Sequence, residues 1–356
     1  MFSATQNVAD SEHYRSRLTG KEKVSVLARQ THVRIIATGG TIAGRGDSPT
    51  EVAYASAQVS ADELVLAVPG LSELAEISTE TLFALDSKEM GFSHWRSLAA
   101  LIDQRLADAT CDGVVVTHGT DTLEEAAWFL DLVGRWSKPV ILVGSMRPAT
   151  ALSADGPANL YQAVSVCADP AAAGRGVMVV MAADILSGWR AVKISATALN
   201  GFHAYPGGSV GYVSGDQVFF YQGPDPGPLA GRFAALINDG RPLPLIGIQF
   251  CTAGCAQLHN QWWPQGRDAG LVVAGFGGGT VPDTMADALR ERASSGTSIV
   301  ISSRVPKVTV LPETMTLVES DRVVASRYLN PQKAAVLLSL SLAAGRTPLS
   351  SFEALH

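Results

Sequence analysis

Short apolar runs along the chain predict a series of buried strands, each followed by a polar or glycine-containing loop. A continuous apolar run, as opposed to an alternating one, is typical of a strand covered on both faces in a parallel sheet. Runs of this kind in the first half of the chain cover residues 33–37, 113–117, 140–143 and 177–182.

Helical spacing of apolar residues predicts helices between these strands. Ser60 opens one helix, because Glu63 stands three residues later and completes a capping box. Residues 93–107 carry apolar side chains at helical spacing, and two further helices are predicted over residues 121–133 and 155–168. Strand, loop and helix therefore alternate, which is the order that builds a parallel sheet covered by helices.

The pattern changes after about residue 210. Residues 210–221 alternate around Ser214-Gly215-Asp216, which predicts a β-hairpin. A breaker-rich stretch of glycine and proline follows and predicts a linker over residues 222–243. Strands resume at 245–250, 271–274 and 298–302, and Asn330 caps a last helix with Pro331 at its first position.

These elements predict an α/β fold of two domains with mainly parallel sheets, joined by a linker. The larger N-terminal domain covers residues 31–221, the linker 222–243 and the smaller C-terminal domain 244–356. Residues 1–30 are polar and charged without a continuous apolar core. We therefore interpret them as a disordered or loosely attached arm and not as a secretory signal.

Composition narrows the possible functions. Apolar residues make up 47% of the 356 residues, enough for a sizeable core, and the net charge of −6 gives no reason to expect nucleic acid. The chain has no apolar run of the ~20 residues that a membrane helix needs. Its seven histidines show no HxxxH spacing, so we expect neither a metal nor a cofactor.

Four cysteines, Cys111, Cys167, Cys251 and Cys255, are scattered without CxxC spacing. Such cysteines indicate buried thiols in a reducing compartment, with a Cys251–Cys255 pair as the alternative. A cytoplasmic location is the resulting prediction.

Two hydroxyl-bearing loops follow predicted strands, and the first is glycine-rich. The Thr41 loop reads Thr38-Gly39-Gly40-Thr41-Ile42-Ala43-Gly44, and the Thr120 loop reads Thr117-His118-Gly119-Thr120-Asp121-Thr122-Leu123-Glu124-Glu125. In parallel sheets, sites form beyond the carboxyl ends of strands, where glycines let backbone N–H groups approach a ligand. A lone Gly-Gly is by default a structural turn, and one residue suffices to cap a helix. Two such loops in one domain indicate a site.

These loops resemble the two signature segments of the bacterial-type L-asparaginases. The resemblance extends over nearly all of residues 31–356, through the motifs Met146-Arg147-Pro148, Ser153-Ala154-Asp155-Gly156-Pro157, Ser302-Ser303-Arg304-Val305-Pro306 and Leu329-Asn330-Pro331-Gln332-Lys333. It implies hydrolysis of L-asparagine to L-aspartate and ammonia by a threonine nucleophile. An asparaginase-glutaminase of broader specificity is the alternative, and a non-catalytic amino-acid-binding module is a more distant one.

The resemblance also implies roles for individual residues. Thr41 matches the primary nucleophile, and Tyr54 matches a lid tyrosine, at the end of the glycine- and proline-containing stretch that begins at Gly44. Thr120, Asp121 and Lys193 match a second hydroxyl, its acid and a lysine that can accept or relay the hydroxyl proton. Trp189 and Arg190, close to Lys193, depart from the family pattern.

The implied substrate is a small amino-acid amide with a carboxylate and an ammonium. Its binding residues are Gly40, Ser87, Lys88, Thr120 and Asp121. Ser87 would hold the α-carboxylate and Asp121 the ammonium, while backbone N–H groups near Thr120 would stabilise the oxyanion. Lys88 departs from well-known periplasmic members and should weaken ammonium binding unless it points away or pairs with Glu89. The turn Gly275-Phe276-Gly277-Gly278-Gly279-Thr280 lacks an asparagine that some members carry there.

Two other motifs suggest different functions. Gly207-Gly208-Ser209-Val210-Gly211 is literally GxSxG, but a nucleophile elbow needs a strand before it and a helix after it. Here Tyr205-Pro206 precedes the motif and a predicted hairpin follows. Gly275-Phe276-Gly277 superficially resembles a dinucleotide loop, with Thr280 in place of the third glycine.

The family also implies an assembly. Its members form homotetramers built from intimate dimers, in which each site is closed by a neighbouring subunit. Glu313 is the nearest candidate for the acid supplied by that subunit. The apolar last helix, residues 331–344, suits such an interface.

Overall fold

Two sheets organise the chain. The computed structural model describes residues 29–46, 48, 58–255, 263 and 270–355. An eight-stranded sheet has the strand order β10-β9-β6-β5-β4-β3-β1-β2, and a four-stranded sheet the order β11-β12-β13-β14. The second sheet is parallel throughout, and the first is parallel from β2 to β5 and antiparallel beyond. The predicted α/β fold with mainly parallel sheets is confirmed.

The strands of the large sheet place its most apolar segments at the centre. The interior strand β3 is buried at every position, as its uninterrupted apolar run predicts. A small separate antiparallel pair, β7 and β8, follows the sixth strand. The bounds are β1 His32–Gly39, β2 Glu76–Leu85, β3 Gly113–Thr117, β4 Val140–Val143, β5 Val177–Met181, β6 Asp184–Ser187, β7 Ala191–Lys193, β8 Phe202–Ala204, β9 Gly211–Ser214 and β10 Gln217–Phe220.

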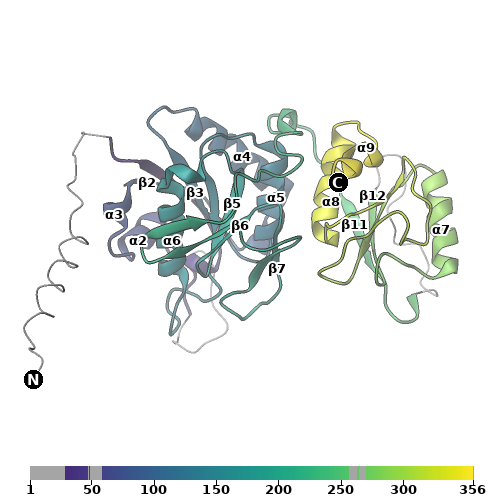
Figure 1. The fold of residues 1–356 in the computed structure, drawn as a ribbon, viewed down its shortest axis with the longest axis horizontal. Coiled ribbons are helices and arrows are strands. Elements are labelled where there is room, and N and C mark those ends of the chain that lie inside the picture. Colours follow the sequence, from purple (N-terminus) through teal and green to yellow (C-terminus); the bar gives the residue numbers. More distant parts are fainter. Residues whose placement is uncertain (1–28, 47, 49–57, 256–262, 264–269, 356) are drawn as a thin grey trace, which may run out of the picture. The chain divides into compact units, whose positions relative to one another are not determined.

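Helices cover both faces of the large sheet, as Figure 1 shows. Successive strand residues point to opposite faces, so Ile35 and Val115 pack on one side and Ile36 and Val116 on the other. Three helices, α2 Ala61–Leu66, α3 Leu71–Leu74 and α6 Gly156–Ala168, cover the first side. Two others, α4 Phe92–Leu106 and α5 Leu123–Val133, cover the second.

The small sheet is also sandwiched between helices. Its strands are β11 Ile246–Phe250, β12 Gly270–Gly275, β13 Ser298–Ser303 and β14 Val323–Ala325. Helix α7 (Asp283–Ser294) packs on one face, and α8 (Pro331–Ala343) and α9 (Pro348–Phe352) pack on the other. Helix α8 also packs against α5, where the indole N–H of Trp128 donates to the carbonyl of Lys333 at 3.1 Å.

Several local predictions are confirmed at the level of hydrogen bonds. Ser60 and Glu63 form the predicted reciprocal capping box of α2. Asn330 caps α8 by accepting from the backbone N–H of Lys333 at 3.1 Å. The hairpin β9–β10 turns at the predicted residues, with Ser214 paired to Gln217.

Other elements differ from the prediction. The sequence pattern does not predict strand β2, because its sequence is polar at many positions and its residues are half-buried or exposed at the edge of the sheet. Helix α7 is also absent from the prediction, and α8 is not the last helix, since α9 follows it. The suggestion that α8 forms an intersubunit surface is wrong. Its apolar side chains, among them Leu337, Leu338 and Leu340, are buried inside this chain.

Candidate active site

The candidate residues gather at one edge of the large sheet. Strands β2, β1, β3 and β4 are neighbours and run parallel, so their carboxyl ends meet at the same edge. Thr41 follows β1, Ser87 follows β2 and Thr120 follows β3. The order of strands therefore brings together three loops that are far apart in the sequence.

Two glycines let the Thr41 loop and the Thr120 loop touch. Gly40 has a φ of +82°, and a Cβ built on it would lie 2.3 Å from the Cα of Gly119. Only a residue without a side chain allows this backbone contact. Below it, the hydroxyl of Thr38 donates to the carbonyl of Thr117 at 2.8 Å and joins the two strand ends. The N–H of Gly40 donates to the carbonyl of Leu85 at 3.0 Å, so this N–H is already used inside the protein.

The two threonines directly follow the touching glycines. Thr41 begins a short 3-10 turn, Thr41–Ala43, and Thr120 lies in the turn before α5. Each of the two residues is only 6% exposed. A hydroxyl held in such a position is oriented by its surroundings, which is what a nucleophile or proton relay requires.

Lys193 reaches the second threonine. Its Nζ donates to Oγ1 of Thr120 at 2.9 Å and to Oδ1 of Asp121 at 2.6 Å. The Lys193 side chain is 17% exposed and that of Asp121 is 62% exposed, so the acid opens to solvent while the amine is largely enclosed. The structure thus brings together Thr120, Asp121 and Lys193, as the sequence predicts.

The neighbours of Lys193 that depart from the family pattern have their own partners. Arg190 forms an ion pair with Asp225 at 3.1 Å. Its guanidinium also lies 4.4 Å from the ring centre of Trp189. Arg190 and Trp189 thus contact Asp225 and each other.

Ser87 lies against the same loops. It is 1% exposed, and a Cβ built on Gly119 would lie 2.5 Å from its hydroxyl oxygen. The hydroxyl of Thr122 donates to the carbonyl of Ser87 at 3.0 Å and ties the loop after β2 to the Thr120 loop. Ser87 is therefore a neighbour of the touching glycines.

Lys88 pairs with an acid other than the one considered from the sequence. Its Nζ lies 3.1 Å from Oδ2 of Asp86, and its side chain is 64% exposed. The hydrogen bond to Asp86 raises the pKa of Lys88, with smaller contributions from Glu89 and Asp121. The ammonium of Lys88 is thus paired with Asp86, and it also interacts electrostatically with Asp121.

The structure does not show two further predicted residues, Tyr54 and Glu313, beside the threonines and Lys193. Tyr54 and most of the predicted lid, residues 44–54, lie outside the described residues. Glu313, the candidate for an acid supplied to a neighbouring subunit, is exposed.

His118 lies in the Thr120 loop and is buried. Its Nδ1 lies 2.8 Å from the carbonyl oxygen of Gly119, and burial lowers its pKa to about 4. It is therefore neutral at physiological pH, and its hydrogen bond fixes the loop.

Sequence reasoning missed the residues that hold Lys193. The carboxylate of Glu124 accepts from the backbone N–H of Lys193. The Nζ of Lys333 donates to three carbonyls in residues 188–191. Both residues stand inside motifs quoted above, which was the available signal, but a motif alone does not say what a buried charge contacts.

The alternative motifs are explained by the fold. The GxSxG string leads directly into β9, with no helix after it, so it does not form a nucleophile elbow. In the glycine turn after β12, Phe276 and Thr280 bond each other's backbone at 2.8 and 2.9 Å, so these amides are used within the turn. All four cysteines are buried free thiols.

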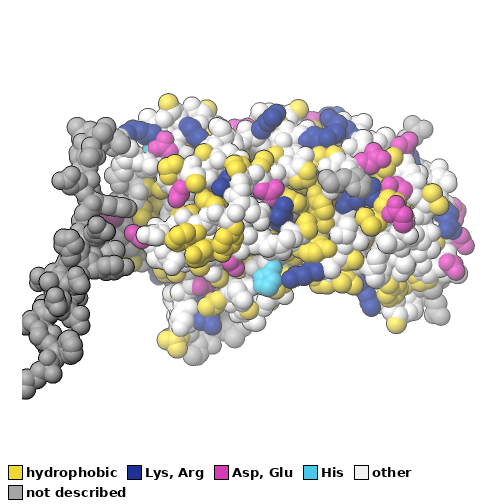
Figure 2. All heavy atoms as spheres, in the orientation of Figure 1, with side chains coloured by type: hydrophobic (Ala, Val, Ile, Leu, Met, Phe, Trp, Pro, Cys, Tyr) yellow, Lys and Arg dark blue, Asp and Glu magenta, His cyan; other side chains and the backbone are white. Residues whose placement is uncertain are grey.

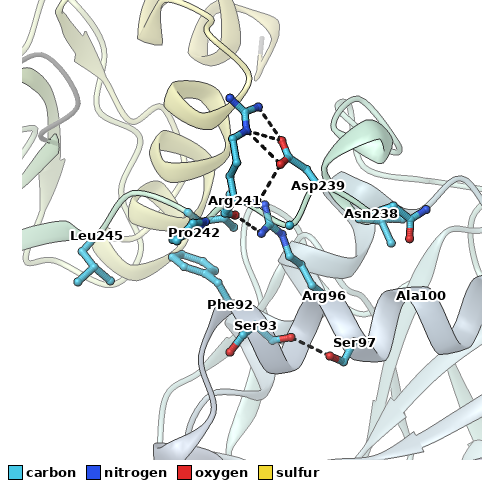
Figure 3. A pocket seen from close by; sticks show the side chains of 13 residues that line it. Phe92, Ser93, Arg96, Ser97, Ala100, Asn238, Asp239, Arg241, Pro242 and Leu245 are labelled. Carbon is cyan, nitrogen blue, oxygen red and sulfur yellow. Dashed lines mark hydrogen bonds and ion pairs between the residues drawn. The ribbon is translucent and has the colours of Figure 1, made fainter.

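Two surface hollows in the described part of the chain can be compared with the candidate site. A pocket of about 600 Å³ lies between α4 and residues 237–245, where Arg241 pairs with Asp239 and Arg96 donates to a backbone carbonyl (Figure 3). A smaller hollow of about 400 Å³ is lined by Asp121, Lys193 and Glu125, among others. The candidate site is instead defined by contacts between residues, namely the hydrogen bond of Lys193 to Thr120 and the touching glycines Gly40 and Gly119. Figure 2 shows Lys and Arg interspersed with Asp and Glu over the described residues of one face.

The described residues also bear on membranes and metals. Within them, no helix has the length and apolar character needed to cross a bilayer. In the same part of the chain, no three His, Cys, Asp or Glu side chains lie where they could hold a metal ion.

Comparison with known proteins matches this architecture. Residues 32–226 match the family model "Asparaginase, N-terminal", and residues 250–351 match "Glutaminase/Asparaginase C-terminal domain". L-asparaginase 2 of Escherichia coli is 39% identical over 319 residues, covering 89% of this chain and 90% of that protein. A glutaminase-asparaginase of Pseudomonas aeruginosa is 34% identical, covering 90% of this chain and 89% of that protein.

A solved structure agrees with the sequence matches. The probable cytoplasmic L-asparaginase of Campylobacter jejuni superimposes with a TM-score of 0.80 at 35% identity, covering 92% of this chain and 99% of that one. Both domains, the strand order and the threonine loops thus lead to one assignment: this chain belongs to the asparaginase family.

Proposed function

We propose that this protein hydrolyses L-asparagine to L-aspartate and ammonia by threonine nucleophilic catalysis, without a metal or cofactor. The observation that carries the proposal is the contact of the Thr41 and Thr120 loops, with Lys193 Nζ 2.9 Å from the Thr120 hydroxyl. Two relatives named L-asparaginase or probable L-asparaginase, each 39% identical, support the choice of substrate.

The chemistry proceeds in two balanced steps. Thr41 Oγ1 attacks the side-chain amide carbon, the C–N bond breaks, and ammonia leaves with the hydroxyl proton. Water then attacks the Thr41 ester and releases aspartate, restoring the hydroxyl. Tyr54 assists Thr41, and Lys193 with Asp121 moves the proton of Thr120. Backbone N–H groups near Thr120 stabilise the oxyanion.

The substrate is held at its α-carbon groups. Ser87 binds the α-carboxylate, and Asp121, whose carboxylate opens to solvent, binds the ammonium. Gly40 contributes by its lack of a side chain, since its N–H donates to Leu85 and its carbonyl accepts from the N–H of Ala43. Lys88 adjusts substrate binding.

Ammonia release from purified protein tests the proposal, with L-asparagine, L-glutamine and D-asparagine compared at equal concentrations. Selective turnover of L-asparagine supports it. Comparable turnover of L-glutamine would support the broader activity that the Pseudomonas relative's name describes. Binding of asparagine without any ammonia release would identify a non-catalytic binding module. Mass spectrometry of a trapped acyl-enzyme identifies which threonine carries the ester.

Assembly and location complete the proposal. We propose the domain division 31–221, 222–243 and 244–356 after an arm of 1–30, and a homotetramer of intimate dimers. Light scattering that finds an active monomer would contradict the tetramer.

We also propose a cytoplasmic location. The Campylobacter relative is called cytoplasmic and a Haemophilus influenzae relative, 39% identical, periplasmic, so cell fractionation decides.

A further inference from the structure

The short segment that carries Lys193 is held by charged groups from two helices. We call residues 188–193 the lysine segment. Lys333 of α8 donates from Nζ to the carbonyls of Gly188 at 3.4 Å, Trp189 at 2.9 Å and Ala191. Glu124 of α5 accepts from the backbone N–H of Lys193. The segment is therefore held through its carbonyls and through its last amide.

Glu124 links this segment to the start of α8. Its second oxygen accepts from Asn330 Nδ2 at 2.9 Å and from Gln332 Nε2 at 2.7 Å. Glu124 is 2% exposed, and all three of its partners donate N–H groups, which suits a carboxylate because it only accepts. Asn330 at the same time caps α8. Helix α8, the Glu124 carboxylate and the lysine segment thus form one continuous chain of hydrogen bonds.

Lys333 is suited to hold several carbonyls at once. An ammonium carries three donors, and three carbonyls of the lysine segment surround this one. The side chain is 2% exposed, and burial lowers its pKa to about 8, opposed by Glu124, Glu125 and Asp131. At pH 7 the group is therefore still mainly cationic.

We propose that Glu124 and Lys333 are positioning residues for Lys193, so that helix α8 of the C-terminal region fixes the reach of Lys193 to Thr120. Neither residue touches the reacting atoms; both act on the backbone of the lysine segment. A misplacement of about 1 Å in an active site can cost ~100-fold in rate. The inference rests on the proposed function, because it assumes that Lys193 serves Thr120 in catalysis.

Glu124→Gln tests the inference, with Glu125→Gln as the matched control. The change keeps the size of residue 124 but turns one acceptor into a donor that faces other donors. Glu125 is adjacent, half-buried, and has an enclosed Oε2 without a hydrogen-bond partner in the described part of the chain. We expect Glu124→Gln to lower kcat by about 10- to 100-fold. KM should stay within about threefold, because Ser87 and Asp121 are untouched. Glu125→Gln should match the wild type at pH 7.

The double variant Glu124→Gln with Gln332→Glu separates positioning from a general structural defect. In it, the amide introduced at position 124 can donate to the carboxylate introduced at position 332 and still accept from the Lys193 N–H. Recovery of at least about tenfold in kcat, relative to Glu124→Gln, is expected if this chain of hydrogen bonds places Lys193. If Glu124→Gln does not fold, Glu124→Asp, which keeps the charge but shortens the reach, takes its place.

Amide exchange provides a readout that does not depend on activity. The Lys193 amide should exchange at least about tenfold faster in Glu124→Gln than in the wild type or in Glu125→Gln. Equal exchange in all three proteins, or an unchanged kcat in folded Glu124→Gln, would overturn the inference. A wild type that releases no ammonia from any amino-acid amide would instead overturn the proposed function, while the exchange experiment would still test whether Glu124 anchors Lys193.

Discussion

Gly40 and Gly119 touch through their backbones, and a Cβ on Gly40 would come within 2.3 Å of Gly119 Cα. The two residues follow neighbouring parallel strands, β1 and β3. Since Thr41 and Thr120 come directly after them, this contact sets the distance between the two hydroxyl loops. The absence of two side chains is therefore a structural requirement of the candidate site.

Gly119→Ala should damage substrate binding. Its Cβ would lie 2.5 Å from the hydroxyl oxygen of Ser87 and 2.6 Å from its Cβ, so Ser87 must move. We expect KM for asparagine to rise at least about tenfold, which corresponds to ~1.4 kcal/mol, and a stability loss of about 1–3 kcal/mol from overpacking. Gly208→Ala is the control, because a Cβ there meets nothing within 4 Å. A KM for Gly119→Ala equal to that of the control would show that Ser87 does not bind substrate.

Thr41→Ala and Thr120→Ala should each lower turnover at least about 1000-fold, because a residue that acts as part of one catalytic unit cannot be replaced by its neighbours. Each change removes a hydroxyl and leaves the backbone, so circular dichroism should remain unchanged. Ser209→Ala, in the GxSxG string before β9, should retain full ammonia release. Near-normal activity of either threonine variant would contradict the proposed mechanism.

Lys88→Gln should alter binding and leave the maximal rate unchanged. Lys88 is exposed and paired with Asp86, and its charge acts on Asp121. Removing this charge should lower KM for asparagine, by no more than about fivefold, because exposed pairs interact weakly. The difference between variant and wild type should shrink at high salt. A collapse of kcat at saturating asparagine would place Lys88 in the chemistry.

The titration of Glu125 should lower the free energy of unfolding as pH rises. Burial, together with the nearby Glu124, raises its pKa from 4.5 to about 8. Between these two values the folded protein holds a proton that the unfolded chain has lost, so the free energy of unfolding falls with increasing pH. Glu125→Gln removes this dependence. Its Tm should equal that of the wild type near pH 5 and exceed it by a few degrees at pH 9, at roughly 2–4 °C per kcal/mol. A Tm difference that is constant across this range would refute the assignment.

Local sequence signals were sufficient for most of the secondary structure. The uninterrupted apolar run of β3, the capping box at Ser60 and the Asn330 cap all act within a few residues, so their outcome does not depend on distant partners. Strand β2 could not be predicted from local sequence signals, because it lies at the edge of the sheet. Its mixed polar pattern is stabilised by pairing with β1, which no local signal reports.

The sequence by itself determined the α/β class, the two hydroxyl loops and the family whose motifs they carry. Only the tertiary structure decided that Gly40 touches Gly119, that Lys88 pairs with Asp86, and that Lys193 reaches Thr120. It also decided that Glu124 and Lys333 hold the lysine segment. The physical reason is that these contacts join residues far apart in the chain, and their geometry is set by the strand order and by the packing of α5 on α8. A sequence motif identifies the chemical groups of a site, but the contacts of a buried charged side chain depend on how the helices and strands pack.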